Sequence, residues 1–161
     1  MKTLFRILTI LLLLCFTRCS LPDSDYIDPY KPKIMERSVM ESSVKMLPSQ
    51  NIIRSGKIYI KDNFMFINDV NIGFHIYNYS NPENPIKIGF IQTYGATDLA
   101  VRDNFIYINQ AVDLVTLQYN VNSNTITVSH RNRNVFPQKQ SPNGTIANTT
   151  ENQIVIDWTK F

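Results

Sequence analysis

An eight-residue motif occurs twice in this sequence, with its two copies 41 residues apart. Residues 61–68 read KDNFMFIN and residues 102–109 read RDNFIYIN, so five positions are identical and three are conservatively replaced. In both copies Asp-Asn precedes a run of strand-favouring residues, which is typical of a tight turn followed by a strand. A period of about 40 residues built on strands is typical of arrays of small antiparallel sheets, such as propeller blades. The motif therefore predicts an architecture but no reaction or ligand.

Each repeat contains four predicted strands. The Asp-Asn pairs at 62–63 and 103–104 form two-residue turns, because both side chains tolerate a left-handed backbone. The proline-containing loop 80–85 separates the third and fourth strands of the first repeat, and Asn122–Asn124 takes its place in the second. The predicted strands are 57–61, 64–68, 74–79 and 86–92 in the first repeat, and 98–102, 105–109, 114–119 and 125–130 in the second.

The second strand of each repeat begins with four consecutive apolar or aromatic residues. Residues 64–67 and 105–108 do not alternate with polar residues, and a strand covered on both faces has this pattern. We therefore expect these strands to be internal, with Phe64 and Phe105 buried. The predicted fold class is all-β, a partial β-propeller-like array of two four-stranded antiparallel blades with a weak N-terminal helical segment.

The rest of the chain is assigned around the two repeats. Met35, Val39, Met40 and Val44 have roughly helical spacing, which predicts a short helix within residues 33–46 that ends before Pro48. Because propellers usually have four to eight blades, two repeats indicate missing blades or an oligomer. The predicted segments are a signal peptide (1–18), a tether (19–33), a lead-in (34–56), blade 1 (57–97), blade 2 (98–137), and a polar loop with the start of an incomplete further repeat (138–161).

The N-terminus is typical of an export signal. Lys2 and Arg6 precede an apolar run of eight residues, 7–14, which is too short to span a bilayer stably. Cys19 ends the apolar stretch and is followed by an acidic, proline-containing segment, so we predict a lipoprotein signal with lipidation at Cys19. Cys15 is the alternative lipidation site. The same residues are also compatible with a plain secretory signal or with an uncleaved anchor.

Cleavage before Cys19 changes how the charge is interpreted. The formal charge of +3 comes from Lys2, Arg6 and Arg18, so the mature chain has thirteen basic and thirteen acidic residues. A neutral mature chain gives no electrostatic reason to expect a nucleic acid as partner. With Cys19 lipidated, no thiol pair remains for a disulfide or a metal site.

The sequence contains no recognised catalytic motif, and its polar candidates are few. His75 lies in a predicted strand, with Thr116 as its counterpart in the second repeat. The predicted turns account for the recurrence of Asp62 and Asp103 in the two repeats without a catalytic role. Three further candidates remain. His130, Arg131 and Arg133 are a candidate anion-binding patch, and Asp69 and Asp113 are candidate carboxylates facing a central channel. A carbohydrate-stacking surface is the third candidate, formed by Tyr77, Tyr79, Tyr94, Tyr107 and Tyr119. The interpretation preferred for all of them is structural, so no catalytic, cofactor-binding or metal-binding residue is predicted.

Residues 34–137 resemble the LVIVD-repeat lipoproteins of Gram-negative bacteria. The resemblance is carried by residues 37–69, by GFHIYNYSNPENPIKIGFI at 73–91, by DLAVRDNFIYINQAVDLVTLQYN at 98–120 and by NVFP at 134–137, and IVIDW at 154–158 is similar to the start of the family's next segment. The resemblance implies a propeller-like fold of several blades in a lipid-anchored protein of the cell envelope. Members of the family are longer than this chain, and they provide no agreed catalytic residues to transfer.

These observations lead to one expected function and two alternatives. We expect a non-catalytic envelope lipoprotein, attached to the outer membrane by its lipid, that binds a protein or a glycan through loops on a rigid scaffold. One alternative is an envelope enzyme whose site requires the missing C-terminal blades. The second is a truncated gene product without a function of its own.

Overall fold

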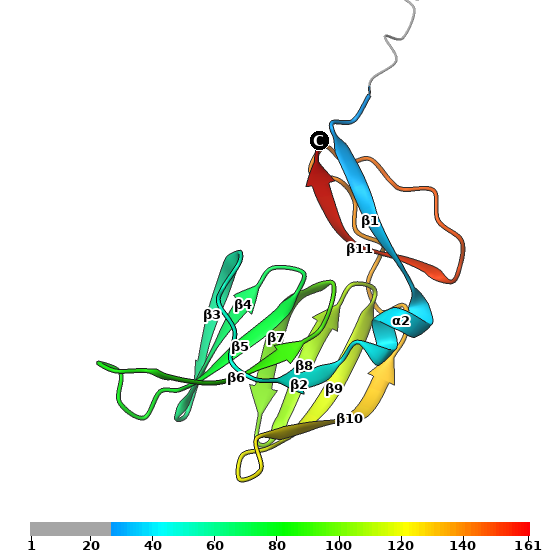
Figure 1. The fold of residues 1–161 in the computed structure, drawn as a ribbon. Helices are drawn as coiled ribbons and strands as arrows, with labels where there is room; N and C mark the ends of the chain where they lie inside the picture. The colour runs from blue at the N-terminus through cyan, green and yellow to red at the C-terminus, as the bar shows by residue number, and fades with distance from the viewer. Residues whose placement is uncertain (1–26) are drawn as a thin grey trace, which may run out of the picture.

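The computed structural model describes residues 27–161, which form two antiparallel β-sheets and a separate two-stranded ribbon (Figure 1). These sheets confirm the predicted all-β fold class. The described elements are β1 (Tyr30–Glu36), α2 (Arg37–Ser42), β2 (Lys45–Leu47), β3 (Ser55–Lys61), β4 (Phe64–Asp69), β5 (Gly73–Asn78), β6 (Ile86–Gln92), β7 (Ala96–Arg102), β8 (Phe105–Gln110), β9 (Asp113–Asn120), β10 (Thr125–Asn132) and β11 (Gln153–Lys160).

Each sequence repeat forms one sheet. The first sheet has the strand order β2-β6-β5-β4-β3 and the second has the order β10-β9-β8-β7. The eight strands predicted from the repeats are all present, with ends that differ by at most two residues. Asp62 and Asp103 adopt left-handed backbone conformations with φ of 53° and 54° in the β3–β4 and β7–β8 turns, so their predicted turn role is confirmed.

The main hydrophobic core lies between the two sheets. Phe66, Phe74 and Ile76 of the first sheet pack in one cluster with Ile106 and Ile108 of the second. Across the same interface the rings of Phe64 and Tyr119 meet edge to face, with centroids 5.7 Å apart. Edge-to-face contact is a favoured geometry for aromatic pairs. Burial of these side chains from both sheets makes the two repeats one folded unit.

The repeats stack face to back. Directly opposed residues of antiparallel strands share one face of a sheet, and successive residues of a strand point to opposite faces. Phe66 of β4 is buried against the second sheet, whereas its repeat equivalent, Tyr107 of β8, lies on the outer face. Conversely, Ile106 of β8 is buried, whereas its equivalent, Met65 of β4, is half-buried on the other side. The two copies of the motif thus bury opposite faces.

This stacking corrects one expectation. β4 and β8 are internal strands of their sheets, as predicted, but only one face of each is covered by the other sheet. Phe105, on the outer face, is therefore half-buried rather than fully buried, and Phe64 is half-buried at the margin of the core, against Tyr119.

The lead-in segment differs from its prediction. The helix covers only Arg37–Ser42, and the residues after it form strand β2, which pairs with β6. The first sheet consequently has five strands instead of the four expected. Lys45–Leu47 becomes a strand because the free edge of β6 offers backbone partners, and the helical spacing of the side chains carries no information about that edge.

The two ends of the described chain pair with each other. β1 and β11 form an antiparallel ribbon from Tyr30 opposite Lys160 to Glu36 opposite Gln153, with a bulge after Lys33. The expected tether is therefore wrong from Tyr30 onward. IVIDW belongs to a strand that pairs with β1 instead of beginning a further four-stranded sheet.

The ribbon packs against one end of the sheets (Figure 1). A second, smaller core joins Met40 of α2, Ala111 and Val112 of the β8–β9 turn, and Ile154 and Ile156 of β11. Among residues 27–161, no helix has the length and apolar character needed to cross a membrane. Cys15 and Cys19 lie outside the described residues.

Candidate functional site

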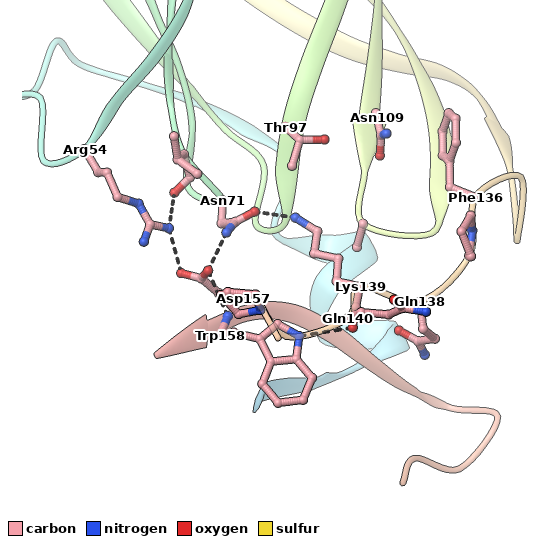
Figure 2. A pocket seen from close by; sticks show the side chains of 14 residues that line it. Arg54, Asn71, Thr97, Asn109, Phe136, Gln138, Lys139, Gln140, Asp157 and Trp158 are labelled. Atoms are coloured by element: carbon pink, nitrogen blue, oxygen red, sulfur yellow. Dashed lines mark hydrogen bonds and ion pairs between the residues drawn. The ribbon is translucent and has the colours of Figure 1, made fainter. Parts of the chain in front are cut away.

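A groove of about 880 Å³ lies between the ribbon and the strand ends of the two sheets. Figure 2 shows Thr97 and Asn109 pointing into it from β7 and β8, opposite Lys139, Asp157 and Trp158. Its volume is within the range usual for sites that bind small molecules, about 300–1,000 Å³. The lining is rich in amides and includes two aromatic side chains, Phe136 and Trp158.

Asp157 organises the charged wall of the groove. Its carboxylate accepts hydrogen bonds from Arg54, at 2.9 Å, and from the side-chain amide of Asn71. Asn71 lies in the β4–β5 turn with a left-handed φ of 63°, a conformation that asparagine tolerates. Asp157 thereby ties the last strand of the ribbon to the first sheet.

Lys139 is held on the same wall without a carboxylate in direct contact among the described residues. Its ammonium donates a hydrogen bond to the Oδ1 atom of Asn71. Burial, with a smaller contribution from Arg54, lowers the pKa of Lys139 to about 8, although the charge of Asp157 opposes the shift. A half-buried amine without a contacting anion is a costly group, which makes Lys139 a candidate binding residue.

Asn109 has a polar atom with no protein partner. Its Oδ1 atom is buried and accepts no hydrogen bond among the described residues. Asn109 ends the second copy of the repeated motif. Its equivalent in the first copy, Asn68, is buried and donates to the Gly73 carbonyl at 3.2 Å. Buried acceptors are normally satisfied, so the unpaired Oδ1 atom makes Asn109 an unusual residue of the groove wall, and a ligand donor reaches this atom once the amide turns toward the groove.

Trp158 gives the groove an apolar side. Its indole N–H donates to the Lys139 carbonyl at 3.0 Å, which fixes the ring beside the segment that holds the amine. The combination of a fixed ring, amide groups and one ammonium can bind a ligand that has both hydroxyl groups and an apolar surface. Sequence reasoning missed this site, and the only available signal was the asparagine that closes each copy of the motif.

Replacing Lys139 by methionine is expected to stabilise the protein near neutral pH. Below about pH 8 the folded state must keep a charge in the groove, because the folded pKa lies below the usual 10.5. Between these two pH values the unfolded state binds more protons, so wild-type stability rises with pH. After subtracting the lost hydrogen bond to Asn71, the gain is about 1–2 kcal/mol near pH 7. It should shrink as the pH approaches 10.5.

Urea unfolding at several pH values measures this difference. Lys160→Met, which removes an exposed lysine from the ribbon, is the control. A Lys139→Met gain that stays constant from pH 7 to pH 10 would contradict the assignment.

The two aspartates expected near a channel are structural. Asp69 is buried and accepts from the backbone N–H groups of Ile53 and Arg54, at 2.9 and 2.7 Å, and lies 3.1 Å from His75 Nε2. Burial by itself raises the pKa of Asp69, but these hydrogen bonds outweigh it and hold the pKa below its usual value.

Asp113 is completely buried. It accepts hydrogen bonds from Arg37 at 3.0 Å, from Arg131 at 2.9 Å and from the backbone of Asn134 at 3.0 Å. Neither Asp69 nor Asp113 lines the groove.

His75 is also a buried structural residue. Besides contacting Asp69, its ring lies 4.7 Å from that of Phe90. The strand register makes Val115, rather than Thr116, its counterpart: His75 lies opposite Ile67, and Val115 lies opposite the equivalent Ile108. Beyond this point the equivalent residues of the two repeats are 40 rather than 41 positions apart, because the β8–β9 turn is one residue shorter than the β4–β5 turn.

The predicted basic patch is divided among separate partners. Arg131 binds the buried Asp113, Arg133 binds Glu41 at 2.8 Å, and His130 is exposed and contacts Asn132. Both arginines are thus already neutralised by carboxylates, which removes the basis for a shared anion site.

The tyrosines do not form one exposed surface. Tyr77 and Tyr119 are buried, and the others are half-buried. Tyr119 lies between the sheets and Tyr77 on the outer face of the first sheet. Within residues 27–161, no group of three or more His, Cys, Asp or Glu side chains has an arrangement that could hold a metal ion.

The fold and the groove define an all-β protein with a small-molecule-sized site between a terminal ribbon and two stacked sheets. Comparison with known proteins found no matching family, no matching curated protein and no matching solved structure.

Proposed function

We propose that this chain is a non-catalytic binding module that takes a glycan segment into the groove. The single observation that carries the proposal is the lining of the groove, where side-chain amides, including that of Asn109 with its unpaired Oδ1 atom, lie with two aromatic rings. When the Asn109 amide turns toward the groove, a sugar hydroxyl supplies the missing donor, and an unpaired acceptor costs about 1–3 kcal/mol.

The remaining groups of the groove fit the same class of ligand. Amide and hydroxyl side chains both donate and accept, as the alternating hydroxyl groups of a sugar require. The flat C–H faces of a sugar match aromatic rings such as Trp158 and Phe136. Lys139 donates to a hydroxyl or to an acidic substituent. The wall as a whole carries two cations, Arg54 and Lys139, and one anion, Asp157, which favours a neutral or acidic glycan.

A glycan array probed with the full-length chain in mild detergent tests the proposal. The wild type is expected to bind a subset of glycans, and Asn109→Leu, which removes the acceptor at similar size, is expected to weaken binding about tenfold or more. Asn148→Leu is the matched control, because Asn148 is exposed and lies outside the groove. Absence of binding to every glycan, or binding unaffected by Asn109→Leu, would contradict the proposal.

We also propose that the two sheets are consecutive blades of a propeller-like array, in keeping with the resemblance to LVIVD-repeat lipoproteins. The support is that the sequence repeat coincides with one four-stranded unit and that the two units stack face to back. Successive blades of a propeller pack in the same manner around its axis.

The proposed location is the outer membrane of the cell envelope, through a lipid on Cys19. Replacing Cys19 by alanine is expected to move the protein from the membrane fraction to the soluble fraction, because removing the modified thiol removes the acyl chains that hold it. Fractionation with metabolic lipid labelling measures this, with Cys15→Ala as the control. Retention of Cys19→Ala in the membrane with the label on Cys15 would assign the lipid to the alternative site.

A further inference from the structure

The outer faces of the two sheets carry apolar side chains that no described residue covers completely. On the first sheet, Ile58 and Ile60 of β3 are 59% and 56% exposed, and Met65 and Ile67 beside them on β4 are half-buried. These four residues share one face, because Ile58 lies opposite Ile67 and Ile60 opposite Met65. We call them the isoleucine face.

The outer face of the second sheet is different in composition. Phe105 and Tyr107 of β8 are half-buried there, and Ala100 of β7, opposite Tyr107, is exposed. These three residues are the aromatic face. It lies on the opposite side of the stack from the isoleucine face, since each sheet buries its other face against the other sheet.

The repeat shows what each face is built to contact. The equivalents of the isoleucine face in the second repeat, 41 positions later, all belong to the core between the sheets: Leu99, Val101, Ile106 and Ile108. The equivalents of the aromatic face in the first repeat are Tyr59, Phe64 and Phe66, which pack against that same core from the first sheet. The internal interface is thus an aromatic face of one repeat against an aliphatic face of the next.

We propose that a second copy of this chain docks its aromatic face onto the isoleucine face. Each chain presents both halves of an interface whose chemistry its own two sheets already use, so the occupant that fits is another copy. The segment between β2 and β3 lies against the outer face of the first sheet at Asp69. Its backbone donates to Asp69, and Ile53 within it is a further exposed apolar residue, at 78%.

This contact is heterologous, because two different surfaces meet. Heterologous contacts add subunits in one direction and end only when a ring closes. Two, three or four copies would bring four, six or eight sheets into a ring, which are the sizes usual for propellers. The contact uses none of the residues that line the groove and does not require that a glycan binds there.

Light scattering on the full-length chain, purified in mild detergent, tests the proposal when the measured mass is corrected for bound detergent. The wild type is expected to form a small closed oligomer. Ile60→Glu on the isoleucine face and Ala100→Glu on the aromatic face each place a charge at an exposed position and should each weaken association about a hundredfold. Ile146→Glu, at a 69% exposed position outside both faces, is the control and should leave the oligomer intact. A single cooperative thermal unfolding transition in each monomeric variant ensures that the variant is folded and that the effect arises from association, whose loss by itself lowers the unfolding temperature.

Mixing the two single variants shows which face of one chain contacts which face of the next. Ile60→Glu retains its aromatic face and Ala100→Glu retains its isoleucine face, so the mixture should form a one-to-one dimer although each variant alone is monomeric. A monomeric wild type would overturn the proposal. An Ala100→Glu variant that still associates by itself would also overturn it, because the isoleucine face would then be binding to its own copy in a symmetric dimer.

Discussion

Phe66→Ala is expected to lower the free energy of unfolding by about 3–5 kcal/mol, whereas Tyr107→Ala, at the equivalent position of the second repeat, should lower it by about 1 kcal/mol. Phe66 is 1% exposed in the core between the sheets, and its removal leaves a cavity lined by side chains of both sheets. Tyr107 lies on the outer face, where water replaces the lost ring. The difference follows from face-to-back stacking of the repeats.

Urea unfolding at protein concentrations where the chain is monomeric measures both changes, since association through the aromatic face would add to the cost of Tyr107→Ala. Equal losses for the two variants would mean that the two copies of the motif bury the same face. Such a result would exclude the packing described for the core.

Asp113→Asn is expected to lower the free energy of unfolding by about 3–5 kcal/mol. The Asp113 carboxylate is buried and faces the guanidinium groups of both Arg37 and Arg131, with N–O distances of 3.0 and 2.9 Å. Neutralising it leaves Arg131 without a contacting carboxylate among the described residues and leaves Arg37 with only Glu41, 3.6 Å away. Because Arg37 begins α2 and Arg131 lies near the end of β10, the loss should loosen the contact between the ribbon and the second sheet.

Asp103→Asn is the matched control, because it makes the same chemical change at an exposed turn. Asparagine also tolerates the left-handed conformation of Asp103, so the expected change is within about 0.5 kcal/mol. Thermal and urea unfolding of the two variants give the comparison. A cost at Asp113 as small as that at Asp103 would show that Arg37 and Arg131 remain satisfied without the carboxylate.

Local patterns were sufficient for the strands and turns of the repeats. The Asp-Asn pairs predict hairpins because their left-handed tolerance acts within two residues, and the β-branched and aromatic runs favour strands directly. The eight strands and both turns are therefore where the sequence places them. Met40 illustrates the opposite case: its helical spacing with Met35 indicated a longer helix, but Met35 pairs with Ile154 in a strand instead.

The candidate site was beyond prediction because its parts are brought together over long separations. Lys139 meets Asn71, Asp157 meets Arg54, and Asn109 faces them from another sheet. No local pattern distinguishes the buried Asn68 from Asn109, although both end the same motif. Likewise, nothing near Asp113 in the sequence identifies Arg37 as its partner.

The amino-acid sequence alone determined that this protein contains two equivalent four-stranded units, each with a tight turn between its first two strands. It could do so because backbone preference and side-chain alternation operate over a few residues. Which face of each unit is buried, the addition of β2 to one edge, the pairing of β1 with β11 and the groove that results were decided by the tertiary structure. Those features depend on which distant surfaces can exclude water together and satisfy each other's backbone groups, and that is a property of the assembled sheets.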